Sequence, residues 1–189
     1  PSLLMNLGLA YRDAGDLDNS VDRFEKAIEG ASAQGDKGIL GSIVGNLGCT
    51  QLERGRFEKA RTCHFKALEV SRDLKQRRLE GDDLGNIGNV YFAEEKYPEA
   101  IDYQTQALAI AREVENRIGE GNCLLNLGFA TFRNGQYLDG IKLMEDALKI
   151  FEDEEYHFGK ANCLFNLGVC HVDQNSVRKA TDYYEKACE

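Results

Sequence analysis

The sequence predicts an all-α fold, a solenoid built from five tandem helix hairpins. Three observations predict it. A repeat of 40 residues runs through the whole chain of 189 residues, the apolar residues inside each repeat have helical spacing, and proline occurs only at Pro1 and Pro98. Proline is rare in long helices because it removes a backbone hydrogen bond and clashes with the preceding turn, and repeats of about 20 to 50 residues are typical of solenoids.

An Asn-Leu-Gly or Asn-Ile-Gly triplet marks the register of the repeat. It recurs every 40 residues without insertion, beginning at Asn6, Asn46, Asn86, Asn126 and Asn166. The triplets divide the chain into five units, at 1–40, 41–80, 81–120, 121–160 and a shorter 161–189. We expect one continuous repeat array over 1–189 and interpret it as a fragment of a longer protein with further repeats.

The first half of each unit predicts a helix, here named helix A. Leu124, Leu127, Gly128 and Thr131 follow the i, i+3, i+4, i+7 spacing of one helix face. After a shorter first copy, we expect helix A at 38–54, 78–94, 118–134 and 158–174.

The second half of each unit predicts a partner helix, helix B. Small and apolar residues again recur at helical spacing, as at Tyr97, Ala100, Gln104, Ala107 and Ala111. Pro98 fits here because the first helical turn tolerates proline. We expect helix B at 17–34, 57–74, 97–115, 137–154 and 177–189.

The turn inside four of the five units carries a residue that suits a left-handed backbone. These are Gly15, Gly55, Gly135 and Asn175, and Glu95 stands in the same place in the third unit. Glycine and asparagine commonly end a helix in this conformation, so we expect each unit to be a tight hairpin.

Small residues recur at three positions and predict close helix packing. Gly8 and its four equivalents lie inside helix A, where each costs about 1 kcal/mol of helix propensity. We expect them to contact the alanine column of helix B, which comprises Ala27, Ala67, Ala107, Ala147 and Ala187. We expect the third column, Gly41, Gly81, Gly121 and Ala161, to pack on the preceding unit.

The units resemble the tetratricopeptide repeat over the whole chain, and the first unit shows the pattern best. The residues that carry the resemblance are Leu7, Gly8, Tyr11, Ser20, Phe24 and Ala27. The longer 40-residue form with its Asn-Leu-Gly triplet looks like the LGN/Pins group of spindle-orientation adaptors, and more distantly like kinesin light chains. The resemblance implies a right-handed superhelix whose inner groove is lined by the A helices, and an adaptor or scaffold without catalytic activity.

The asparagine column is the strongest candidate for a binding site. A carboxamide offers both a donor and an acceptor, which matches the backbone of an extended peptide. The resemblance implies that Asn6, Asn46, Asn86, Asn126 and Asn166 form a ladder gripping the main chain of a peptide ligand. The alternative is that each asparagine bonds a neighbouring helix and only stabilises the stack.

Apolar and charged residues beside this column are further candidates. Leu125, Phe129, Phe132 and Phe165 fall on or near the expected groove face, and exposed apolar patches with aromatic anchors often mark interaction sites. The alternative is that they pack against adjacent A helices. Arg12 and Arg133 suit a ligand carboxylate, whereas Asp13, Glu53, Asp82 and Asp173 favour basic groups. We interpret the adjacent acids Asp82 and Asp83 as a solvated helix end.

Composition excludes several classes of partner. The net charge of −9 and the isoelectric point near 5.0 argue against nucleic acid and anionic membranes, and no apolar stretch is long enough to span a bilayer. We therefore expect a cytoplasmic protein, with association to the cytoskeleton or cell cortex as an option. Its partners would be proteins or peptides, and its uncapped ends would allow self-association.

No motif indicates an enzyme, a metal site or a cofactor. The sequence contains no phosphate-binding loop, zinc-protease motif or nucleophile elbow. We interpret His64 and His171 as core residues with satisfied nitrogens, and the six cysteines as reduced, with Cys49 the one candidate for an accessible thiol.

Three functions fit this sequence. The first is an adaptor that binds an extended peptide in its groove. The second is a structural assembly component that uses its outer surfaces, and the third is a regulator that senses a short free peptide. Recognition of a peptide C-terminus in the manner of chaperone-binding repeats is disfavoured, because the required basic residues are replaced by Met5, Gly45, Gly85, Leu125 and Phe165.

Overall fold

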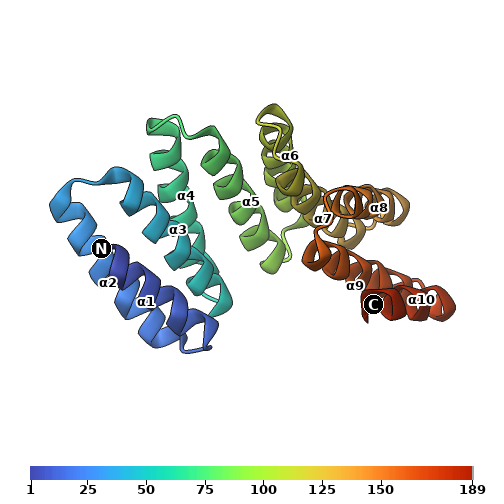
Figure 1. Cartoon of the computed structure of the whole chain (residues 1–189). Coiled ribbons are helices and arrows are strands. Elements are labelled where there is room, and N and C mark those ends of the chain that lie inside the picture. Colours follow the sequence, from blue (N-terminus) through green and yellow to red (C-terminus); the bar gives the residue numbers. More distant parts are fainter. Residues whose placement is uncertain (189) are drawn as a thin grey trace. The chain divides into compact units, whose positions relative to one another are not determined.

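The computed structural model describes residues 1–188, and these residues form ten α-helices and no strand (Figure 1). The predicted all-α class is confirmed. The helices are α1 (Ser2–Asp13), α2 (Leu17–Gln34), α3 (Lys37–Glu53), α4 (Phe57–Asp73), α5 (Arg77–Ala93), α6 (Tyr97–Glu113), α7 (Arg117–Arg133), α8 (Tyr137–Asp153), α9 (His157–Asp173) and α10 (Val177–Cys188).

The odd-numbered helices are the predicted A helices and the even-numbered helices are the B helices. Their ends lie within two residues of the predicted bounds. Within the two compact units given below, four A helices pack against the B helix that follows them: α1 pairs with α2, α3 with α4, α7 with α8 and α9 with α10. The chain divides into two compact units, Pro1–Glu94 with α1 to α5, and a second unit from Glu95 onward with α6 to α10. The organisation as one continuous array stays a prediction.

Every turn between helices contains one residue in the left-handed region. The predicted positions Gly15, Gly55, Glu95, Gly135 and Asn175 are confirmed, with φ between 54° and 89°. The sequence analysis missed the turns between units, where Gly35, Lys75, Glu115 and Glu155 have the same conformation. At eight of these turns a hydrogen bond from the next backbone N–H back to the helix closes the turn, as from Asp16 N to Tyr11 O at 2.9 Å. Because this bond also forms at the turns of Lys75, Glu115 and Glu155, the left-handed geometry does not require glycine.

The mid-helix glycines are required by large side chains of the B helices. A Cβ atom built at Gly8 would lie 2.8 Å from Phe24 Cε1, and one at Gly48 would lie 2.7 Å from His64 Cε1. At Gly168 the neighbour is Tyr184. The prediction that these glycines face the alanine column is therefore wrong. At these three glycines the counterpart is the residue three positions before the alanine, and its ring fills the space above the glycine; at Gly128 the nearest atoms are Gly140 O and Met144 Cγ of α8, both at 2.8 Å.

The third small column packs inside its own hairpin. A Cβ at Gly41 of α3 would lie 2.8 Å from Val70 Cγ1 of α4, and one at Gly121 of α7 would lie 2.6 Å from Phe151 Cε1 of α8. The predicted contact with the preceding unit is therefore wrong at these two positions. The glycines let the end of each B helix approach its own A helix.

The two histidines predicted to be core residues are buried. His171 stacks on Tyr183 with ring centroids 5.3 Å apart. His64 is fully buried, and neither of its ring nitrogens has a hydrogen-bond partner among residues 1–188. The expectation of satisfied nitrogens is wrong for His64, and burial lowers its pKa to about 4.

Candidate functional site

The asparagine column lies on the A helices, as predicted. Asn46, Asn86, Asn126 and Asn166 are half-buried on α3, α5, α7 and α9, and Asn6 is exposed on α1. The side-chain nitrogen of Asn46 donates to Ser42 O at 2.9 Å, and that of Asn166 donates to Asn162 O at 3.0 Å. These two asparagines therefore bond their own helix one turn earlier and not a neighbouring helix. The bond fixes the carboxamide, and Oδ1 of both accepts no hydrogen bond from the described residues.

Two of the predicted groove residues are core residues instead. Leu125 is 3% exposed and Phe132 is 1% exposed. The ring of Phe132 meets Tyr137 edge-on with centroids 5.0 Å apart, at the start of α8. The prediction that Leu125 and Phe132 line an open groove is wrong, because α7 packs against both α8 and α9 and these side chains fill the contacts.

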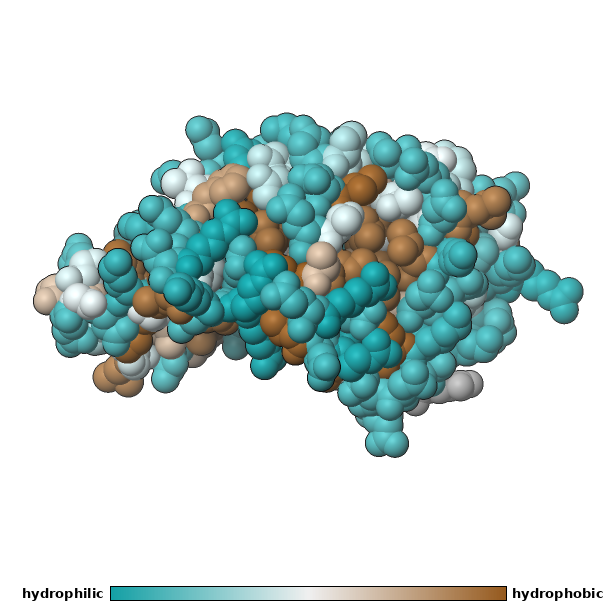
Figure 2. All heavy atoms as spheres, turned by 90° about the horizontal axis from the view of Figure 1, so that it is seen from above, coloured by the Kyte–Doolittle hydropathy of each residue, from teal (hydrophilic) through white to brown (hydrophobic). Residues whose placement is uncertain are grey.

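The equivalent positions on α9 are open. Phe165 is 55% exposed and Val172 is 51% exposed, and Phe158, seven residues before Phe165, is 73% exposed. Residues seven apart lie two turns apart on one helix face, so α9 presents an apolar strip. Over the face seen in Figure 2, polar side chains cover most of the surface and apolar side chains gather in patches between them.

The remaining predicted residues of the second unit lie at its surface or close to it. Phe129 is half-buried and packs against the core cluster of α7 and α8. Arg133 is exposed at the end of α7, with its guanidinium carbon 5.8 Å from the centre of the Tyr97 ring. Phe165 also contacts Tyr184 at 5.6 Å between ring centroids.

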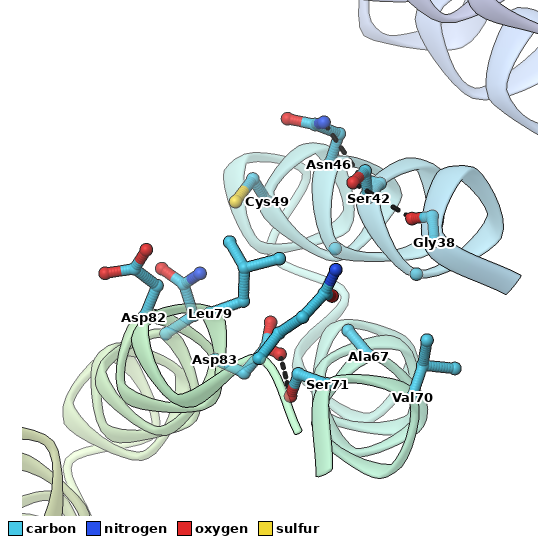
Figure 3. Close-up of a pocket in the computed structure, with 14 residues that line it drawn as sticks. Gly38, Ser42, Asn46, Cys49, Ala67, Val70, Ser71, Leu79, Asp82 and Asp83 are labelled. Carbon is cyan, nitrogen blue, oxygen red and sulfur yellow. Dashed lines mark hydrogen bonds between the residues drawn. The ribbon is translucent and has the colours of Figure 1, made fainter. Parts of the chain in front are cut away.

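A pocket of about 220 Å³ lies in the first unit between α3, α4 and α5 (Figure 3). Two members of the asparagine column, Asn46 and Asn86, are among its lining residues. The lining comprises Gly38, Gly41, Ser42, Gly45, Asn46, Cys49, Ala67, Val70, Ser71, Gln76, Leu79, Asp82, Asp83 and Asn86.

On the α3 side of the pocket, glycines leave space because they have no side chain. Gly38, Gly41 and Gly45 lie on this side at helical spacing. A Cβ atom at Gly45 would lie 3.8 Å from Ala67 Cβ and 3.9 Å from Asp83 Oδ1. A methyl group would therefore fit, whereas a long side chain at this position would occupy the pocket.

The α5 wall carries two carboxylates. Asp83 Oδ2 accepts a hydrogen bond of 2.9 Å from Ser71 Oγ of α4, and Figure 3 shows Asp83 pointing towards Ser71 while Leu79 projects towards α3. Asp83 is half-buried, and burial raises its pKa to about 6. Asp82 is exposed; partial desolvation raises its pKa and the charge of Arg78 opposes that rise. Among residues 1–188, neither carboxylate has an ion-pair partner. The pocket therefore holds negative charge that no basic side chain among its lining residues balances.

Cys49 is the thiol predicted to be accessible, and it lines this pocket. Its side chain is half-buried and burial raises its pKa, so the thiol is protonated at neutral pH. It supplies a polarisable surface to the pocket and no reactive thiolate.

The sequence analysis interpreted Asp83 as part of a solvated helix end, whereas its side chain is half-buried and lines the pocket, and it did not single out Ser71. A signal for both residues was present. The 40-residue register aligns Asp83 with Leu3, Ile43, Cys123 and Cys163, and it aligns Ser71 with Ala31, Ala111 and Phe151. Polar residues thus replace apolar ones at two columns within one unit and its neighbour. A charge in an otherwise apolar column indicates a site that serves something other than packing.

Metal and membrane features are absent from the described part of the chain. Within residues 1–188, no group of three or more His, Cys, Asp or Glu side chains could hold a metal ion. In the same residues, no helix combines the length and apolar character needed to cross a membrane.

Solved structures with similar folds cover nearly the whole chain. A Rap protein complexed with competence and sporulation factor has a TM-score of 0.87 and 15% identity, over 97% of this chain and 52% of that one. BtubC from P. vanneervenii has a TM-score of 0.79 and 18% identity, over 97% and 76%. The Rap conjugation gene regulator of plasmid pLS20, in complex with the Phr* peptide, has a TM-score of 0.72 and 19% identity, over 83% and 44%. The chain spans about half the length of these Rap proteins, and the likeness shows the fold.

Sequence comparison identifies the family. No curated protein sequence matches the chain. The family model for the tetratricopeptide repeat matches residues 1–73, 83–131 and 120–189. Together with the ten helices in hairpin order within the described residues, this coverage shows that the chain belongs to the tetratricopeptide-repeat family.

Proposed function

We propose that this chain is a non-catalytic interaction scaffold that binds an extended peptide segment of a partner protein. One observation carries the proposal: two asparagines of the repeated column, Asn46 and Asn86, line the same pocket from successive A helices. The proposal includes the narrower likeness to the spindle-orientation adaptors, whose 40-residue units carry the same triplet.

The spacing of the two asparagines suits a peptide main chain. The helices α3 and α5 are in contact, and packed helices lie about 8–10 Å apart. An extended chain advances roughly 3.3 Å per residue, so amides on successive A helices would meet the peptide backbone about three residues apart. The carboxamide of Asn46 is already fixed by its bond to Ser42, so binding would cost little side-chain entropy.

The second unit would supply a separate set of contacts. Asn126 and Asn166 carry the same column there, and Phe129, Arg133 and Phe165 are the predicted side chains that reach the surface. Exposed aromatic residues are common anchors for a peptide side chain. The pLS20 regulator, whose structure contains the Phr* peptide, supports the idea that this fold accommodates a peptide.

The test is a peptide selection followed by mutation. A displayed library of random dodecamers is selected on the whole chain, and the enriched peptide is titrated by fluorescence anisotropy against the wild type and the double variant Asn46→Ala, Asn86→Ala. Asn134→Ala, an exposed residue at the end of α7, is the matched control. We expect at least tenfold weaker binding by the double variant, an unchanged Tm within a few degrees, and no effect of the control.

Two results would argue against this function. A double variant that loses stability but binds normally in its folded fraction would assign the asparagines to the fold alone. Failure of every enriched peptide to bind the soluble chain would remove the peptide as a ligand. Small-angle scattering with and without the peptide separates a scaffold, which keeps its dimensions, from a peptide sensor, which changes them.

A further inference from the structure

We infer that the pocket between α3, α4 and α5 takes the guanidinium group of an arginine side chain, held by the carboxylates of Asp82 and Asp83. The inference rests on the proposed function, because the arginine would belong to the bound peptide. It goes beyond that function by assigning the pocket a side-chain specificity.

The lining of the pocket is complementary to a cation. Asp82, Asp83 and the carboxamides of Asn46 and Asn86 supply acceptor oxygens, and no lysine, arginine or histidine is among the lining residues. The volume of about 220 Å³ is sufficient for one long side chain. Apolar contacts for its methylene stem are available at Leu79 and Val70.

Three coordinated changes in the repeat pattern create the pocket. Asp83 and Ser71 replace apolar residues of their columns, and Gly45, like Gly85 in the next unit, stands where the remaining units have Met5, Leu125 and Phe165. Leu125 is buried in the core of its own unit, so a side chain of that size at position 45 would fill the space. Each change alone would cost stability, and together they open a cavity and place charge at its wall.

Partial burial disfavours the ionised carboxylate of Asp83, and a bound cation would offset this desolvation. The groups that act on Asp83 are Asp82 and Glu80 on its own helix, Ser71 on α4 and the Cys49 thiol of α3. The nearby arginines act on the other acids: Arg72 and Arg77 pair with Glu80, and Arg78 acts on Asp82. Burial near other carboxylates raises the pKa of Asp83 to about 6. A cation entering the pocket would stabilise the ionised form and lower that pKa. Affinity should therefore fall as the pH is lowered from 7 to 5.

Arginine fits these acceptors better than lysine does. Ser71 already donates to Oδ2 of Asp83, while Oδ1 lies 3.9 Å from a Cβ position at Gly45, on the α3 side of the pocket. The remaining acceptors are spread over two helices. A planar guanidinium presents five donors at its edge and is more weakly hydrated than an ammonium group, so it can reach several of these acceptors at once.

The test uses small probes that each carry a single side chain, so the peptide sequence need not be identified first. Acetyl-arginine amide, acetyl-lysine amide and acetyl-citrulline amide are titrated into the whole ¹⁵N-labelled chain, and amide shifts are followed by NMR. Citrulline is the neutral near-isostere of arginine. We expect saturable millimolar shifts at Gly45, Ser71 and Asp83 with the arginine probe, at least threefold weaker binding of the lysine probe, and no binding of the citrulline probe.

Variants test the role of the carboxylates. Asp83→Asn keeps an acceptor oxygen for Ser71 and removes the negative charge, so it should weaken binding of the arginine probe at least tenfold. Asp153→Asn, an exposed residue at the end of α8, is the control and should change nothing. Equal shifts with arginine and citrulline, or unchanged arginine binding by Asp83→Asn, would overturn the inference.

The outcomes also separate this inference from the proposed function. Selected peptides that bind without arginine and without dependence on Asp83 would leave the scaffold function standing and remove the pocket specificity. If the arginine probe binds but no selected peptide does, the guanidinium site is supported and the proposed peptide-binding function is contradicted.

Discussion

Ser71 Oγ lies 2.9 Å from Asp83 Oδ2 and 3.0 Å from the carbonyl oxygen of Leu68. The hydroxyl has a single proton, so it cannot donate fully to both acceptors. Protonation of Asp83 would let the carboxyl group donate to Ser71 while Ser71 donates to Leu68 O. The bond that Ser71 donates favours the ionised carboxylate, but burial opposes it more strongly, and the charges of Asp82 and Glu80 add to the effect of burial, so the pKa of Asp83 is raised to about 6.

The first prediction is that Asp83→Asn stabilises the free protein. The pKa of Asp83 is raised from 3.8 to about 6, so between these values the folded state binds more protons than the unfolded state. Stability from this group is therefore lost as the pH rises through that window. Because the side chain is only partly buried, we expect a gain of about 1 kcal/mol at pH 7 and none below pH 4. Urea unfolding at both pH values measures it, and a destabilised variant at pH 7 would contradict it.

The second prediction concerns His64 and acid. Its pKa is lowered from 6.5 to about 4, so in this range the unfolded state binds the proton and the folded state does not. The stability is present above pH 6.5 and is lost as the pH falls towards 4, by at most roughly 3 kcal/mol at 1.36 kcal/mol per pH unit. His64→Phe, which copies Phe24 over Gly8, should raise stability at pH 5 and flatten the pH dependence. Thermal melts of both proteins from pH 7 to 4 check this, and parallel curves would count against it.

The third prediction contrasts two glycines of α3. Gly48→Ala places a Cβ 2.7 Å from the buried His64 ring and should destabilise the fold by about 1–3 kcal/mol despite better helix propensity. Gly45→Ala meets only ordinary contacts near 3.8 Å and should stabilise it by up to about 1 kcal/mol. Equilibrium unfolding of the pair gives the comparison, and equal effects would show that the two helix faces are packed alike.

A larger side chain at position 45 should close the pocket, and this is the fourth prediction. Gly45→Leu introduces the side chain found at Leu125 in the fourth unit, so the helix should remain folded while the cavity is filled. We expect loss of acetyl-arginine amide binding by at least tenfold, with Gly45→Ala as the mild control. Circular dichroism establishes that the helices are retained, and full binding by the folded leucine variant would show that the probe sits elsewhere.

The fifth prediction tests the corrected assignment of the aromatic residues. Phe132→Ala removes a fully buried ring and should cost about 3–5 kcal/mol. Phe165→Ala removes a ring that is 55% exposed and should cost about 1 kcal/mol or less. Urea unfolding of the two variants measures the difference, which would vanish if both rings were on an open groove.

The sequence predicted the helices and the turns inside units well, because both depend on local patterns. Helical spacing is visible in one chain, and the glycine at Gly15 or Gly55 marks a left-handed turn directly. The turn at Lys75 was missed because a lysine gives no such signal, and there the backbone closure of the helix end imposes the conformation.

The packing partners and the pocket were predicted less well. Gly48 indicates close helix packing, but only the three-dimensional structure shows that its packing partner is His64 and not Ala67. Leu125 and Phe132 follow the same spacing as groove residues, and their burial depends on neighbouring helices that a helix-face pattern does not include. The roles of Asp83 and Ser71 were not predicted, because the repeat pattern identifies residues that recur, whereas these two depart from their columns.

The left-handed residue recurs every 20 residues, at turns within hairpins and between them alike. The turns at the two ends of a helix therefore have the same backbone conformation. The backbone alone does not show where one repeat ends and the next begins. The pocket is lined by α3 and α4 from one repeat and by α5 from the next, so its residues span the boundary between two of the repeats that the triplets define. Anyone transplanting the pocket into another array should move residues 36–94 as a single cassette, because exchanging one 40-residue unit would separate Ser71 from Asp83.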